Sequence, residues 1–186
     1  MMSAVIMKLV PRHLRRLVRD QRGVSAVEFA MLLPLMVTLY LGGVEVSQGI
    51  SIDRKVTLTA RTVADLVSQV ASINNSDMNS VLQASSAVLS PYPVDKAKVT
   101  VSLVKIDNNS KVTVEWSDSL NGTARAKGSA VTLPSALIVP NTSLVWGEVE
   151  YSYKPTVGYV VTGTMSLKDQ IFMRPRLSDS ITRTSS

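Results

Sequence analysis

The sequence predicts an α+β fold in which a long N-terminal helix, first transmembrane and then amphipathic, packs on an antiparallel β-meander. Three observations support this prediction. Residues 29–44 form an apolar run without a charge, apolar residues then recur every three or four positions over 52–70, and the period falls to two after Pro93. We expect four segments: a basic leader 1–23, a transmembrane helix 24–46, an amphipathic helical region 47–93 and a β-rich domain 94–186.

The positive charge of the 186-residue chain is concentrated near its start. Residues 1–23 carry a net charge of +5, and the other 163 residues carry +1. Because positively charged flanks of a membrane helix stay in the cytoplasm, we expect the N-terminus inside and the C-terminal domain outside. A basic tail can also bind nucleic acid, but no aromatic residue interleaves with these arginines as a stacking platform requires. We therefore expect no nucleic-acid partner.

The apolar run is long enough to cross a bilayer. Residues 24–46 contain two charges, Glu28 and Glu45, and about 20 mostly apolar residues span the hydrocarbon core as a helix. A buried core helix is the alternative, and the basic flank favours the membrane. A cleaved secretory signal has a shorter apolar stretch and a small-residue cleavage site, and no such triplet follows this run. The anchor and its contacts with membrane lipid are assigned to seven residues: Phe29, Leu32, Leu33, Pro34, Leu35, Leu39 and Leu41.

Two features of the run concern the bending of this helix and the environment of its second glutamate. Pro34 removes a backbone hydrogen bond, which neighbouring helices or local adjustments can restore in a membrane. Together with Gly42 and Gly43, it indicates a helix that can bend or locally melt; a kink without a role is the alternative. Glu45 lies near the outer end of the run, where we expect interfacial solvation.

Residues 22–29, RGVSAVEF, are the most informative stretch. A glycine ends the basic leader, a glutamate stands five residues later, and an aromatic residue follows at once. This arrangement resembles the processing site of type IV pilins and pseudopilins. The wider run RGVSAVEFAMLLPLM resembles the TadE-like family of minor pseudopilins of the tight-adherence (Flp/Tad) pilus system. The segments EVEYSYKP and FMRPR, at 148–155 and 172–176, are similar to the carboxyl end of TadE/TadG-like proteins.

The resemblance implies how the chain is processed and assembled. A prepilin peptidase would cut after Gly23, recognising Gly23, Val24, Glu28 and Phe29. Glycine has no side chain, so an enzyme can approach its carbonyl closely, and the new amine on Val24 would lie about one helical turn from the Glu28 carboxylate. A lone carboxylate at the bilayer centre costs about 2.5–3.5 kcal/mol. The resemblance implies that Glu28 pairs with the N-terminal amine of a neighbouring subunit and so sets the assembly register; the alternative is that Glu28 only marks the membrane boundary beside Arg22.

A helical stripe continues beyond the anchor. Six apolar residues recur at spacings of 4, 4, 3, 4 and 3: Ile52, Val56, Ala60, Val63, Val67 and Val70. A coiled coil is the alternative, but the stripe is short and rich in alanine and valine. Residues 74–77 end this helix, and Ser76 or Asp77 can cap a second helix that runs to about Leu89 and is stopped by the Ser-Pro-Tyr-Pro sequence at 90–93.

Period-two alternation predicts the sheet. Val99, Val101 and Leu103 alternate with polar residues, and a second set does the same: Val112, Val114 and Trp116. The turn residues 107–110, Asp-Asn-Asn-Ser, join the two sets into a β-hairpin. The polar stretch 117–135 is expected to be a long loop.

Three further strands complete the predicted sheet, at about 144–153, 157–165 and 171–173. The first of them places four residues on one face: Val145, Val149, Tyr151 and Tyr153. A helix followed by an antiparallel meander is the α+β, pilin-like plan that the resemblance implies. The Arg174-Pro175-Arg176 cluster is expected at a solvated edge, with a partner-binding patch as the alternative.

The sequence does not predict an enzyme. The chain has no cysteine, and its one histidine, His13, lies in the leader on the predicted cytoplasmic side, so a Ser-His-Asp site or a histidine metal site in the outer domain is excluded. No phosphate-cradling glycine motif occurs. Glu148 and Glu150 share a strand face, which a polar outward surface explains better than acid–base chemistry. We expect no catalytic residue, no cofactor and no metal.

Two hypotheses of function follow. The first is a minor pseudopilin or pilus-assembly component, with the prepilin peptidase, other pilins or pseudopilins and the assembly platform as partners. It would be a single-pass inner-membrane protein with a periplasmic C-terminal domain, or part of a surface pilus. The rival is an unprocessed anchored protein whose periplasmic domain binds a partner or an envelope component. A major fibre subunit is disfavoured, because the resemblance implies a much shorter chain for that role.

Overall fold

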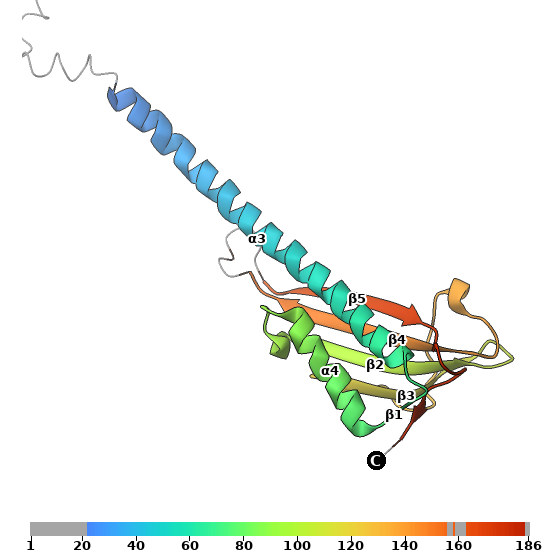
Figure 1. The fold of residues 1–186 in the computed structure, drawn as a ribbon. Helices are drawn as coiled ribbons and strands as arrows, with labels where there is room; N and C mark the ends of the chain where they lie inside the picture. The colour runs from blue at the N-terminus through green and yellow to red at the C-terminus, as the bar shows by residue number, and fades with distance from the viewer. Residues whose placement is uncertain (1–21, 156–157, 159–162, 185–186) are drawn as a thin grey trace, which may run out of the picture. The chain divides into compact units, whose positions relative to one another are not determined.

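The long helix and the sheet that the sequence predicts are both present, which confirms an α+β fold (Figure 1). The computed structural model describes residues 22–155, 158 and 163–184. The elements in chain order are α3 (Arg22–Ser68), β1 (Ser72–Ile73), α4 (Asn75–Leu89), η1 (Val94–Lys96), β2 (Ala97–Ile106), β3 (Val112–Leu120), η2 (Ser135–Leu137), β4 (Thr142–Tyr153), β5 (Met165–Met173) and β6 (Thr182–Arg183).

Helix α3 has two parts of different character. The chain divides into two compact units with the boundary between Val44 and Glu45, and α3 contributes to both. In the first unit its apolar side chains are exposed. In the second unit the predicted apolar stripe is confirmed, because five of its members are at most 3% exposed, and Val70, just after the helix, packs against the same core: Ile52, Val56, Ala60, Val63 and Val67.

The sheet differs from the expected meander in its strand order. The order is β3-β2-β4-β5, with every neighbouring pair antiparallel. The β2–β3 hairpin is confirmed, and the Asp107 carboxylate accepts hydrogen bonds of 2.8 Å from the amides of Asn109 and Lys111 in its turn. Strand β4 then pairs with β2 rather than with β3. The long connection 121–141 lets the chain return to the other edge of the hairpin, and this places β2 in the interior of the sheet.

A β-bulge corrects the predicted faces of β3. Leu103 pairs with Trp116 but the next residue, Val104, pairs with Val114, so Glu115 is the extra residue. Trp116 therefore packs in the core beneath the helices, whereas Val112 and Val114 pack on the opposite face. The sequence pattern had placed all three on one face.

The main core lies between the sheet and the two helices α3 and α4, which cover the same face (Figure 1). Strand β4 contributes the predicted face to this core, and Tyr151 and Tyr153 are 2% and 6% exposed. Gly147 lies in the same row. A Cβ on Gly147 would lie 2.9 Å from the Ala60 carbonyl oxygen and 3.0 Å from the Ala64 Cβ. The absent side chain therefore lets α3 approach the strand closely.

A second apolar cluster covers part of the other sheet face. Residues from β2, β3, β4 and the long connection between β3 and β4 pack there: Val104, Ile106, Val112, Val114, Leu133, Leu144 and Trp146. The expected loop 117–135 is shifted, since β3 continues to Leu120 and the connection runs to Asn141. Arg125 of this connection stacks over Trp146, with 3.9 Å from its Cζ to the ring centroid.

Helix α4 begins slightly earlier than expected. Asn74, rather than Ser76 or Asp77, is its N-cap, and the Asn74 side chain accepts a 2.8 Å hydrogen bond from the Asp77 amide. The helix ends at Leu89, as the Ser-Pro-Tyr-Pro sequence predicts. At this end Lys55 of α3 donates a 2.9 Å hydrogen bond to the Val88 carbonyl, which ties the two helices together.

The C-terminal residues close the domain. Strand β6 pairs in parallel with β1, the short strand that lies between α3 and α4 in the sequence. Ile181 is fully buried, and its carbonyl accepts a 2.8 Å hydrogen bond from the Trp116 indole. The expected strand at 171–173 is the end of the longer β5. The expected strand 157–165 falls largely outside the described residues. Of those described, Gly158, Gly163 and Thr164 are not in a strand, and Met165 is the first residue of β5.

Candidate functional site

The predicted processing block occupies the first turns of α3. Gly23, Val24, Glu28 and Phe29 are all exposed, and a Cβ on Gly23 would meet no atom within 4 Å. Val24 and Glu28 are four residues apart on a continuous helix, so they lie on the same side about 6 Å apart along its axis. The backbone at Gly23 is thus open to an approaching enzyme, and the Glu28 carboxylate stands one turn beyond the bond that would be cut.

Glu28 makes no hydrogen bond or ion pair with the described residues. Its neighbours on the helix are apolar, and Val27 and Phe29 are 56% and 59% exposed. A carboxylate in this setting is solvated in water, and in a membrane it has no counter-charge among the residues that the structure describes. A cation from another molecule would therefore stabilise it most in the membrane.

The surface that follows is almost wholly apolar. The most apolar 18-residue window of α3 has no residue buried within the chain, and in the described part of the chain α3 is the one helix long and apolar enough to span a membrane. Six of the seven proposed anchor residues are exposed, and Leu41 is half-buried: Phe29, Leu32, Leu33, Pro34, Leu35, Leu39 and Leu41. Water would have to hydrate this entire surface, whereas lipid would not.

Pro34 does not interrupt the helix. Helix α3 runs through Pro34, Gly42 and Gly43 without a break, and the Thr38 hydroxyl donates a 2.8 Å hydrogen bond to the Pro34 carbonyl. The carbonyl that Pro34 leaves without an amide donor is that of Ala30, four residues earlier, so the Thr38 hydroxyl bonds a different carbonyl.

Glu45 is buried, which corrects the expectation of interfacial solvation. It is 2% exposed, and its backbone carbonyl accepts a 3.1 Å hydrogen bond from the Tyr153 hydroxyl at the end of β4. Burial, and next the charge of Glu45, raises the pKa of the Tyr153 hydroxyl above 10.0. The first turn of α3 after the apolar run is therefore fastened to the sheet.

Comparison with known families agrees with this geometry. Residues 23–65 match the model of the TadE-like protein family. The resemblance read from the sequence is thereby confirmed over most of α3. The match indicates a component associated with the Tad pilus and with a membrane. No curated protein and no solved structure matches the chain.

The TadE-like segment ends where α3 contacts the residues that follow β5. Asp65, its last residue, forms an ion pair with Arg176, and the Arg176 amide donates a 2.9 Å hydrogen bond to the Ser68 carbonyl. The Arg174-Pro175-Arg176 cluster was expected at a solvated edge. Arg174 is exposed, whereas Arg176 connects the end of β5 to α3. Of the two C-terminal segments similar to TadE/TadG-like proteins, 148–155 contains the second half of β4, and 172–176 contains the end of β5 and its link to α3.

A polar groove of about 670 Å³ lies on the sheet face opposite α3. Its charged side chains are largely paired: Arg125 forms a two-pronged ion pair with Glu148, and Lys168 lies 3.1 Å from Glu150. The Ser166 hydroxyl and then Lys168 hold the pKa of Glu150 below its ordinary value of 4.5. No group of three metal-ligating side chains occurs among residues 22–155, 158 and 163–184.

Sequence reasoning found the glutamates of this groove and missed Arg125. The arginine lies in the stretch read as a polar loop, 23 positions before its partner Glu148. No periodicity relates two residues so far apart in a loop and a strand. The polar stretch carries two cationic side chains, Arg125 and Lys127, and nothing in the sequence distinguishes the one that pairs with Glu148.

Proposed function

We propose that the chain is a minor pseudopilin or pilus-assembly component of a type IV-like (Flp/Tad) pilus, cut by a prepilin peptidase after Gly23. The single observation that carries the proposal is the TadE-like match, which begins at Gly23 and covers the exposed apolar part of α3. The basic residues before it favour a cytoplasmic N-terminus, and we therefore propose that the sheet domain is periplasmic.

In this function Glu28 pairs with the amine of Val24 on a neighbouring subunit. Support comes from the exposure of both residues, their spacing of one turn and the lack of a partner for Glu28 among the described residues. The pairing sets the register in which the apolar helices pack. The chain then has an assembly role rather than a catalytic one, with other pilins and the assembly platform as its partners.

Two substitutions separate processing from assembly. Gly23→Leu adds a bulky side chain at the bond to be cut, and we expect the full-length chain to accumulate in the membrane. Glu28→Gln keeps the shape and removes the charge, so we expect the protein to stay in the membrane and to be depleted from sheared pili. Immunoblotting of membrane and pilus fractions checks both, with Gln48→Glu on the exposed part of α3 as the control. Unchanged processing of Gly23→Leu would overturn the proposed cleavage.

The polar groove favours a second candidate function. An unprocessed, anchored protein could use that open surface of about 670 Å³, with its hydroxyl, amide and charged groups, to bind an envelope component. In that case Gly23→Leu has no effect, whereas Lys98→Glu in the groove impairs function. Pilus assays on these two variants discriminate the candidates.

A further inference from the structure

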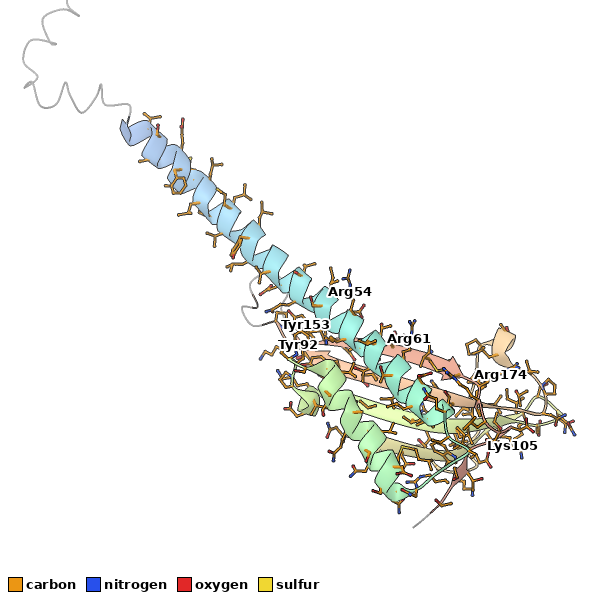
Figure 2. The ribbon with its side chains drawn as sticks, in the orientation of Figure 1. Arg54, Arg61, Tyr92, Lys105, Tyr153 and Arg174 are labelled. Carbon is orange, nitrogen blue, oxygen red and sulfur yellow. The ribbon has the colours of Figure 1, made fainter. Side chains whose placement is uncertain are left out.

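One end of the sheet contacts the residue that directly follows the apolar run in sequence. Glu45 follows directly after the uncharged residues 29–44, and the Tyr153 hydroxyl donates to the Glu45 carbonyl at 3.1 Å. Residues 91–96 and 153–154 form this end, which we call the proximal surface. Tyr92 and Tyr153 lie together there, where α4 and β4 end (Figure 2).

The side chains of the proximal surface suit a phospholipid headgroup layer. Lys96 and Lys154 are exposed, and neither forms an ion pair with a described residue; Asp95 is the acidic residue exposed beside them. Tyr92 is half-buried, with its ring against the main core. Tyrosine is enriched at membrane interfaces because its ring is apolar and its hydroxyl polar, and lysines are attracted to anionic headgroups.

The height above the membrane decides which residues can reach it. The hydrocarbon core is about 30 Å thick and the whole bilayer about 40–45 Å, so each headgroup layer is roughly 5–8 Å deep. A helix that leaves the hydrocarbon near Val46 has Glu45 at this boundary. The turn 107–110 lies at the other end of β2, about 30 Å further along the sheet at 3.3 Å per residue. With the sheet directed away from the bilayer, that turn would lie beyond both the headgroups and the range of their charge.

We propose that the proximal surface rests on the membrane and that its partner is an anionic phospholipid surface, contacted by Tyr92, Lys96 and Lys154. This inference rests on the proposed membrane anchor. The contact would orient the domain on the bilayer, in addition to the tether that α3 provides. Because Glu45 itself is buried, the exposed charge on this surface is basic on balance.

Site-specific labelling tests the inference directly, because the chain contains no cysteine. Full-length single-cysteine variants would carry a fluorophore at Pro93, Lys154, Asn108 or Met36. Each is reconstituted in nanodiscs of phosphatidylcholine and phosphatidylglycerol that contain spin-labelled quencher lipids. We expect headgroup quenchers to act at Pro93→Cys and Lys154→Cys but not at Asn108→Cys, and acyl-chain quenchers to act at Met36→Cys.

The outcomes separate the anchor from the proximal surface. If Met36→Cys is quenched while Pro93→Cys and Lys154→Cys behave like Asn108→Cys, the anchor stands and the membrane contact is wrong. If Met36→Cys is not quenched, the anchor itself is wrong and the contact falls with it. A charge reversal, Lys96→Glu with Lys154→Glu, should lower quenching at Pro93→Cys at least about twofold in phosphatidylglycerol. The matched pair Lys105→Glu with Lys111→Glu should not, and an equal effect of both pairs would contradict a local contact.

Discussion

At the scale of single residues, the hydroxyl of Tyr153 makes a contact at the start of the sheet domain. It joins the last residue of β4 to Glu45 across 108 positions of sequence. The ring also lies against Gly49, where an added Cβ would be 3.6 Å from Cε1. The sequence predicted that Tyr153 faces the core, but it contained no signal for a hydrogen bond to a helix carbonyl so far away.

Tyr153→Phe should therefore weaken the domain by removing one hydrogen bond and leaving the ring in place. We expect the free energy of unfolding to fall by about 0.5–1.5 kcal/mol, measured by denaturant titration of the full-length chain in detergent. Tyr151→Phe is the matched control, since Tyr151 is equally buried and its hydroxyl makes no hydrogen bond with a described residue. An equal fall of the free energy of unfolding in both variants would show that the hydrogen bond to Glu45 does not stabilise the domain.

Glu150 gives a prediction for acid pH. Its pKa lies below 4.5 in the folded chain because the Ser166 hydroxyl and Lys168 stabilise the carboxylate. A lowered folded pKa contributes stability that is present above the unfolded value and is lost as the pH falls through the folded value. Glu150→Gln should therefore have a lower free energy of unfolding than the wild type at neutral pH. Below pH 4.5 the variant should lose less stability than the wild type as the pH falls. Thermal unfolding from neutral to acid pH checks this, with Asp53→Asn, on the exposed part of α3, as the control.

At the scale of elements, the packing of α3 on β4 depends on the lack of a side chain at Gly147. Gly147→Ala would bring a Cβ to 2.9 Å from a backbone oxygen of α3, so the helix must shift. We expect the free energy of unfolding to fall by about 1–3 kcal/mol, as overpacked cores do. Gly49→Ala is the control, because its nearest contact is an ordinary 3.6 Å and alanine favours a helix by about 1 kcal/mol. A stable Gly147→Ala variant would contradict the close approach of α3 to the sheet.

The elements themselves were predictable to different degrees. Periodicity predicted the buried stripe of α3, the end of α4 and the β2–β3 hairpin, because each is encoded by neighbours in sequence. The strand order was not predicted, since a strand after a connection of this length can join either edge of a hairpin. In β2 the alternation of apolar and polar residues stops at Leu103, because Val104 is also apolar. Two adjacent apolar residues are typical of a strand that is buried on both faces.

At the scale of the whole molecule, the part of α3 after Val44 and the C-terminal strands belong to one compact unit. The match covers residues 23–65, and its last residue, Asp65, is paired with Arg176 beyond β5. The exposed apolar run and the family match could be predicted from the sequence, because a long apolar helix and a sequence motif are local signals. Processing after Gly23 stays a prediction. The burial of Glu45 and the role of Arg176 were not, because both depend on the sheet closing against α3.

The measurement that tests the central claim most directly is the intact mass and N-terminal sequence of the protein purified from the membranes of its native host. Processing after Gly23 predicts a chain that begins at Val24, and a Gly23→Leu variant that keeps the leader. A wild-type chain that retains residues 1–23 would contradict the proposed pseudopilin function and would leave the anchored binding protein as the better description.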